Sequence, residues 1–428
     1  MAELLLELFS EEIPAKLQSA ARANLLTSFK NFFEKENINY KDDAKAFSTP
    51  NRLVLCFKKI EREIHQKSEE IRGPSTKAPD KAIEGFLRSN LIKKADIYKK
   101  NTEKGEFFFY KKPSKKIKSE DVLKTKIPNI LKNLSWKKSM KWGTHELYWG
   151  RPLKSILAIF DNKPLKFEFH HLSSSNFTYI DKDFEDKTRI FKSINSYFSY
   201  FKKLNVIIDN GLRKKYIKKK LTDLSNKKNL KININEKLLD EVTDIVEKPK
   251  VISCMFDKKY LNIPKEIITI TMQHHQKYFP TFDKKYNLTN NFFIIADSID
   301  PKNFVKIGNE RVIDARLSDA EFFWNKNKSQ NLVKQISKLK NINYFKGLGN
   351  YYDKVQRLRK LSILISDELL ISKEKIEIAS SICKVDLLSD LVGEFPELQG
   401  VLGGYFAEKQ GFEKEVCIAV SEHYLPTG

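Results

Sequence analysis

Apolar residues recur at two different periods along this chain, and the two periods predict where strands and helices lie. Helical spacing follows Pro14, with Leu17, Ala21 and Leu25 on one face, and it becomes nearly continuous from Leu332 onward. The pattern predicts an α+β N-terminal part, with mixed sheets and packed helices, followed by an all-α part. Short apolar runs predict buried strands at residues 3–9, 49–57, 153–160, 165–169, 267–272 and 292–296, with Asp161-Asn162 as a hairpin turn.

The chain is too long for one ordinary core. Its 428 residues predict several domains, and the change of period supplies the last boundary. We expect an α+β module over residues 1–150, a second α+β module over 151–331, and the start of a helical domain over 332–428.

The composition indicates a well-packed protein with an excess of positive charge. Hydrophobic residues make up 41% of the chain, which excludes a disordered protein, and the net charge of +23 favours a polyanion such as RNA as a partner. Much of the excess is lysine, which also covers ordinary solvated surfaces, so charge carries only part of that argument. Four scattered cysteines predict neither a zinc site nor a disulfide framework. With no signal peptide and no apolar stretch of ~18–20 residues, we expect a cytoplasmic protein.

Residues 305–326 bring charge, glycine and aromatic side chains together more densely than any other stretch. The sequence predicts two possible starts for a helix in this stretch. It can begin after the turn-forming pair 308–309, or it can restart at 318–321, which has the spacing of a capping box. The residues that form its apolar face at helical spacing are Ile313, Leu317, Ala320 and Trp324.

Two arginines of this helix have two possible roles. Arg311 and Arg316 each have an acid three residues later, Asp314 and Asp319, and can be held by it. They can equally be presented to an external anion, either an RNA phosphate or a carboxylate of a partner protein. We expect a structural, partly buried pair for Arg316, and for Arg311 both roles stay open.

Two further arginines are candidates for contact with RNA or a partner. Arg52 is the notable polar group of the predicted strand at 49–57, and Arg151 ends a segment, 136–151, that interleaves three tryptophans with lysines. Such a segment can stack on bases, but we favour tryptophans as core anchors with the lysines pointing outward. The basic run 213–220 is predicted to be a solvated helix face.

Many ordered blocks of the sequence resemble one family. The stretch GNERVIDARLSDAEFF at 308–323 resembles the signature of the β subunit of bacterial glycyl-tRNA synthetase, the kind built from two α and two β chains. One loop departs from the family, with Ser-Asn-Phe-Thr-Tyr at 175–179 in place of a glycine-histidine-arginine run. The other matching blocks are LLLELFSEEIPAK at 4–16, TPNRLVL at 49–55, RGPSTKAPDKAIEGF at 72–86, MKWG at 140–143, LLDEVTDIVEKP at 238–249, TMQHHQKYFP at 271–280 and VGEFPELQGVLGGYFA at 392–407.

The resemblance implies a role in attaching glycine to tRNA. It implies that the α chain carries the site for ATP, Mg and glycine, with no cofactor in this chain, while the β chain grips tRNA and completes the tetramer. Arg52, Arg151, Arg311 and Arg316 are then candidates for contact with tRNA or with the α chain. The family's helical domain resembles the histidine–aspartate metal phosphohydrolase fold. Because family members are longer, we expect this chain to be a fragment without the anticodon-binding region.

The sequence shows no catalytic motif of its own. It has no phosphate-binding P-loop, no Gly-x-Gly-x-x-Gly and no Gly-x-Ser-x-Gly. His274 and His275, placed on a predicted strand, face opposite ways, and we expect both to be buried and satisfied. The acids expected along one face of a helix are Asp386, Asp390 and Glu394.

Two other functions are alternatives to a ligase subunit. A metal-dependent phosphohydrolase needs several histidines, whereas residues 332–428 hold only His423. We therefore interpret the acidic helix face as solvated or as a face that excludes RNA, and not as a metal site. The other alternative to a ligase subunit is a stand-alone RNA-binding or scaffold protein.

Overall fold

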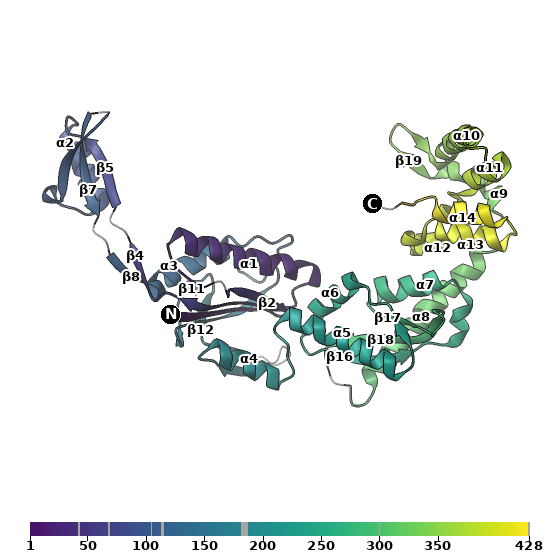
Figure 1. The fold of residues 1–428 in the computed structure, drawn as a ribbon, viewed down its shortest axis with the longest axis horizontal. Helices are drawn as coiled ribbons and strands as arrows, with labels where there is room; N and C mark the ends of the chain where they lie inside the picture. The colour runs from purple at the N-terminus through teal and green to yellow at the C-terminus, as the bar shows by residue number, and fades with distance from the viewer. Residues whose placement is uncertain are drawn as a thin grey trace. The chain divides into compact units, whose positions relative to one another are not determined.

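The computed structural model describes residues 1–41, 43–66, 69–103, 105–112, 115–180, 187–298 and 300–426. They form two compact units (Figure 1). Unit 1 comprises Met1–Arg213 and Thr243–Lys248, and unit 2 comprises Lys214–Val242 and Pro249–Gly428. Each unit mixes helices with sheets, which confirms the α+β class for the N-terminal part. The predicted boundaries at 150/151 and 331/332 stay predictions.

The main sheet of unit 1 is covered on both faces. Its strands run in the order β11-β12-β9-β1-β3-β2, with β10 paired to β9. The central strand β1 (Ala2–Ser10) is antiparallel to β3 (Arg52–Ile60) and to β9 (Leu153–Phe160). Because both faces are buried, β1 reads as a nearly continuous apolar run rather than an alternating one.

Helices supply the two outer layers of unit 1. Alternate side chains of β1, such as Leu4 and Leu6, join a core that includes α1 (Ala15–Lys35) and α3 (Ser119–Lys132). Leu5, on the opposite face, joins a second core that includes α4 (Ile194–Lys203). The period of two in the strand therefore decides which core each residue enters.

The predicted hairpin turn after β9 is confirmed, but the predicted partner strand is wrong. Asp161 and Asn162 have φ of 50° and 64°, as a two-residue hairpin turn requires. The returning strand is β10 (Lys163–Pro164), whereas only β11 (Glu168–Phe169) forms in the predicted strand 165–169, and it pairs with β12. The remaining strands of this region are β2 (Lys45–Thr49), β12 (Leu172–Ser175), β13 (Phe177–Tyr179) and β14 (Thr188–Ile190).

A small α+β insertion separates β3 from α3. Its first and last strands, β4 (Glu63–Gln66) and β8 (Lys115–Lys118), pair with each other. Between them lies a sheet of order β5-β7-β6. Its elements are β5 (Glu69–Ser75), α2 (Asp80–Asn90), η1 (Lys94–Asp96), β6 (Ile97–Thr102) and β7 (Gly105–Lys112).

Unit 2 contains a sheet of order β15-β17-β18-β16. The strand predicted at 292–296 is confirmed within β18 (Leu288–Ala296), but the one predicted at 267–272 is wrong. That segment forms the helix α7 (Lys265–Ile270) after Pro264, followed by a π-helical turn, η3 (Thr271–His275). A short apolar run cannot be assigned by periodicity alone. The other elements are β15 (Lys231–Ile232), β16 (Lys250–Met255), η2 (Lys258–Asn262), β17 (Phe279–Phe282) and α8 (Phe304–Asn327).

Residues beyond 332 are mainly helical, as predicted, with one short hairpin. The likeness of this region to a phosphohydrolase fold stays a prediction. Among the described residues, no helix is long and apolar enough to cross a membrane. The elements are α9 (Leu332–Gln335), η4 (Ile336–Asn341), β19 (Asn343–Phe345), β20 (Gly349–Asn350), α10 (Tyr351–Leu369), α11 (Lys373–Ile382), η5 (Val385–Leu388), α12 (Asp390–Glu394), η6 (Pro396–Leu398), α13 (Val401–Lys409) and α14 (Lys414–Glu422).

Two helices contribute residues to both units. α5 (Asn210–Lys227) begins in unit 1 and continues in unit 2 from Lys214. α6 (Glu236–Ile245) belongs to unit 2 up to Val242, and its last residues belong to unit 1.

Candidate functional site

Three segments that are far apart in sequence meet around Arg316 in unit 2. Nη1 of Arg316, on α8, lies 4.0 Å from Oε1 of Glu394 at the end of α12. The ring of His275, in η3, stacks on Phe395 with centroids 5.5 Å apart and planes 7° from parallel. The pocket between them is lined by Thr271, His275, Arg316, Asp319, Ala320, Glu394 and Phe395 and holds about 10 Å³. This volume admits about one water, so the pocket is too small to enclose a small-molecule substrate.

The buried face of α8 turns Arg316 outward. All four predicted apolar residues are buried, which confirms that face, and the Trp324 ring stacks on Phe406 at 5.7 Å. Arg311 and Arg316 consequently lie on exposed parts of the helix.

Neither predicted start of α8 is correct. The helix runs unbroken from Phe304, so 308–309 forms no turn and 318–321 forms no cap. Its first turn is held by Asp300, whose Oδ2 accepts a hydrogen bond from the Lys306 backbone N–H at 2.9 Å. Asn309 lies inside the helix, where its Oδ1 accepts a hydrogen bond from the Tyr278 hydroxyl at 2.6 Å.

The predicted ion pairs within α8 are also wrong. Among the described residues, Arg311 forms no ion pair, and Arg316 reaches Glu394 instead of Asp319. Asp314 is occupied elsewhere, because its Oδ1 accepts a hydrogen bond from the backbone N–H of Asp257. The Arg316 side chain is 52% exposed, and such a pair contributes less than about 1 kcal/mol. The expected buried structural role of Arg316 is therefore wrong, and both arginines are accessible to an external anion.

His274 and His275 are exposed rather than buried, because η3 is a helical turn and not a strand. Nδ1 of His274 lies 4.0 Å from Oε1 of Glu397. The two histidines thus add polar groups to the same surface as Arg316.

Arg52 lies in the core of unit 1 and has no accessible surface. Its Nη1 donates to Oε2 of Glu7 at 3.0 Å, and its Nε lies 3.7 Å from Oε2 of Glu247. Its guanidinium carbon lies 4.7 Å and 4.5 Å from the ring centres of Phe9 and Phe201. Although burial by itself lowers it, the pKa of Arg52 is raised by these carboxylates. An arginine enclosed in this way holds the fold together and cannot reach RNA.

The segment that departs from the family pattern completes this buried cluster. The Thr178 hydroxyl donates to Glu7 and accepts from Nη1 of Arg52 at 3.3 Å. The backbone carbonyl of Tyr179 accepts from Nη2 of Arg52 at 2.7 Å. The Tyr197 hydroxyl also donates to Glu7, and burial, reinforced by the Glu7 charge, raises the pKa of Tyr197. Residues 175–179 therefore have a structural role in this chain.

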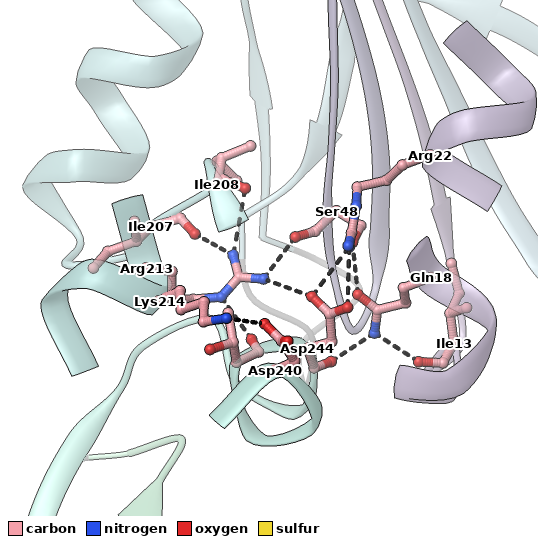
Figure 2. Close-up of polar contacts among 11 residues, drawn as sticks. Ile13, Gln18, Arg22, Ser48, Ile207, Ile208, Arg213, Lys214, Asp240 and Asp244 are labelled. Carbon is pink, nitrogen blue, oxygen red and sulfur yellow. Dashed lines mark hydrogen bonds and ion pairs between the residues drawn. The ribbon is translucent and has the colours of Figure 1, made fainter. Parts of the chain in front are cut away.

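A second buried arginine, Arg213, holds the chain segment 243–248 in unit 1 (Figure 2). Its Nε donates to the Thr243 carbonyl at 2.8 Å, and its Nη2 donates to the Ser48 carbonyl at 2.8 Å. Its Nη1 donates to the Ile207 carbonyl. The prediction of a solvated basic run is therefore wrong at Arg213, which is fully buried, but confirmed for exposed residues such as Lys219.

Asp244 is the acid at the centre of the same network. Its Oδ1 lies 3.6 Å from Nη2 of Arg213 and 3.1 Å from Nη1 of Arg22 on α1. Its backbone carbonyl accepts a hydrogen bond from Nε2 of Gln18 at 2.6 Å (Figure 2). This network was not predicted from the sequence, in which Arg213 and Asp244 lie in separate helices. Removing one partner of a buried ion pair is strongly destabilising, because it leaves a buried charge uncompensated.

Arg151 is partly exposed, and its Nη1 donates to the Gly150 carbonyl at 2.7 Å. The tryptophans before it support the core interpretation. Trp149 is fully buried, and its ring lies 5.2 Å from that of Trp136. A Cβ on Gly150 would come within 2.4 Å of the Trp136 ring, so glycine is required for this close packing. Arg151 remains available at the edge of this cluster.

The three acids predicted on one helix face do not share a helix. Asp386 is buried in η5, where its Oδ2 accepts from the Gly400 backbone N–H at 2.6 Å and burial raises its pKa to about 6. Ser389 then caps a new helix, α12, which contains Asp390 and Glu394. In the part of the chain that the structure describes, no group of three or more His, Cys, Asp or Glu side chains is arranged to hold a metal.

Comparison with known proteins extends over the whole chain. A family model described as glycyl-tRNA synthetase beta subunit matches residues 4–428. Glycine–tRNA ligase beta subunits of Rickettsia prowazekii and Rickettsia typhi are each 36% identical over all of this chain, and that of Rickettsia felis is 35% identical. The chain spans 64% of the length of each of these relatives. Because the family model covers nearly every residue, the chain belongs to the glycyl-tRNA synthetase beta subunit family.

Proposed function

We propose that the protein acts as the β subunit of a glycine–tRNA ligase. In this role it binds and positions tRNA(Gly) and assembles with an α subunit that carries the ATP, Mg and glycine sites. The observation that carries the proposal is the family match over residues 4–428. We further propose a tetramer of two α and two β chains in the cytoplasm.

The contribution of this chain to the reaction is positioning. Holding a bulky second substrate in register replaces a slow bimolecular encounter with an effectively unimolecular step. The net charge of +23 favours binding of a polyanion. The exposed arginines Arg311 and Arg316, with Arg151, are the proposed contacts to tRNA or to the α chain, whereas Arg52 is excluded by its burial.

The test is glycine-dependent exchange between ATP and pyrophosphate. We expect no exchange from this chain alone, since its sequence has no nucleotide-binding motif. Addition of the matching α chain is expected to give exchange, and the two chains are expected to co-purify.

Exchange by this chain without the α chain would contradict the assignment of the chemistry to the partner. Tight tRNA binding without any capture of the α chain would instead favour a stand-alone RNA-binding protein.

A further inference from the structure

A short hairpin in unit 2 exposes apolar side chains among positive charges. Strands β19 and β20 pair as an antiparallel hairpin, and Gly347 and Gly349, with φ of 84° and 80°, allow its tight turn. Phe345 is 67% exposed and Leu348 is 50% exposed. Contiguous exposed apolar surface marks interaction sites, whereas single exposed apolar residues are ordinary.

Two lysines lie against tyrosine rings at this hairpin and at the start of α10. Nζ of Lys354, on α10, lies 4.0 Å from the ring centre of Tyr344, and this ammonium lowers the pKa of the phenol by its hydrogen bond and its charge. Nζ of Lys340 lies 4.9 Å from the ring centre of Tyr352. The ammonium groups of Lys340 and Lys354 thus each lie over the face of an aromatic ring.

The chain segment that forms the hairpin and the start of α10 contains few acids. Residues 340–357 include Lys340, Lys346, Lys354 and Arg357 but only one acid, Asp353. The Asp353 carboxylate is engaged at the start of α10, where its Oδ2 accepts from the Asn350 backbone N–H at 3.1 Å. Nη2 of Arg357 donates to the Leu348 carbonyl at 3.0 Å, which holds a fourth positive charge against the hairpin.

The hairpin also borders an open hollow of about 630 Å³, lined by Asn343, Tyr344, Phe345, Lys346, Gly347, Gly349 and Asn350. This volume is within the range that accommodates a nucleotide-sized group. An aromatic side chain for the base, surrounding cations for the phosphates and a hollow of this size are the features with which proteins bind unpaired nucleic acid strands.

We propose that the β19–β20 hairpin and the start of α10 bind a single-stranded stretch of RNA. Phe345 stacks on a base, and Lys346, Lys354 and Arg357 lie against the backbone phosphates. The proposal deepens the proposed function, on which it rests, by naming a surface for the tRNA. A protein partner would suit the apolar side chains, but the excess of cations favours RNA over a protein surface.

The test measures the affinity of the full chain for a fluorescent single-stranded RNA oligonucleotide and for a blunt RNA duplex. Phe345→Ala is expected to weaken binding of the single strand roughly 5- to 150-fold, because a stacked base is lost. Lys346→Gln is expected to reduce the slope of log affinity against log salt concentration by about 0.7 for one lost phosphate contact. Phe322→Ala, which removes a similarly exposed phenylalanine (63%) from α8, is the matched control and should bind like the wild type.

Several results would overturn the proposal. The wild type could fail to bind the single strand, or Phe345→Ala and Phe322→Ala could lose equal affinity for it. Phe345→Ala could also lose affinity for the duplex alone. Reduced capture of the α chain by Phe345→Ala with RNA affinity intact would make the hairpin a protein-docking surface and also overturn it. Since exchange activity with the α chain is measured separately, failure of the proposed function remains distinguishable from failure of this inference.

Discussion

Replacing Arg52 by alanine should lower the free energy of unfolding of unit 1 by about 3–5 kcal/mol, because it leaves the buried Glu7 carboxylate without its cation. The side chains of Arg52 and Glu7 are both fully buried. The substitution also leaves the Tyr179 carbonyl without a donor from Arg52 and removes a cation packed between Phe9 and Phe201. Thermal melts and urea unfolding monitored by tryptophan fluorescence measure the loss.

A matched control and a double substitution separate the ion pair from general damage. Arg62→Ala removes an exposed arginine paired to Asp161 and should change the unfolding midpoint little. The double variant Glu7→Ala/Arg52→Ala should be destabilised by less than the sum of the two single variants. In the double variant neither charge of the pair is left buried without its partner. Equal midpoints for Arg52→Ala and Arg62→Ala would show that the buried cluster contributes nothing to stability.

Replacing Arg213 by alanine should release the segment 243–248 from unit 1. The guanidinium donates to the carbonyls of Thr243, Ser48 and Ile207, and its loss leaves these buried acceptors without that donor. Leaving buried polar groups unsatisfied costs about 1–3 kcal/mol each, so for three carbonyls we expect a total loss of at least about 3 kcal/mol. Hydrogen exchange of backbone amides in residues 243–248 should accelerate more than exchange in the main sheet.

Lys219→Ala is the control for this prediction, because it removes an exposed cation from the same helix. It should leave both the unfolding midpoint and amide exchange unchanged. If Arg213→Ala destabilises the chain without faster exchange in residues 243–248, the arginine stabilises α5 alone and does not hold that segment.

The apolar positions of this protein could be predicted from its sequence, whereas the partners of its charges could not. Ile313 and Trp324 recur at helical spacing, and that period is enough to place them on the buried face of α8. The same period says nothing of what Arg316 meets across space. Its partner, Glu394, is 78 residues away, and only the packing of α12 beside α8 brings the two together.

One signal of the buried network was present in the sequence. Glu7 interrupts the apolar run of β1, and a carboxylate inside a two-sided sheet requires a cation nearby. Arg52, in another predicted strand, was the natural partner for it. Arg213 gave the opposite signal, because it begins a run of lysines whose other members are solvated. Burial of one arginine in such a run depends on where α5 starts, which periodicity does not determine.

Charging of tRNA(Gly) with labelled glycine measures directly whether this chain takes part in aminoacylation. The α chain is assayed alone, with this chain, and with a relative's full-length β chain as the positive control. We expect glycyl-tRNA formation that depends on both chains, with none from this chain alone. A positioning role for the β subunit would be contradicted if the α chain charged tRNA at the same rate alone, with this chain and with the relative's β chain. If the relative's β chain stimulated charging of tRNA and this chain did not, a positioning role for this chain would be contradicted.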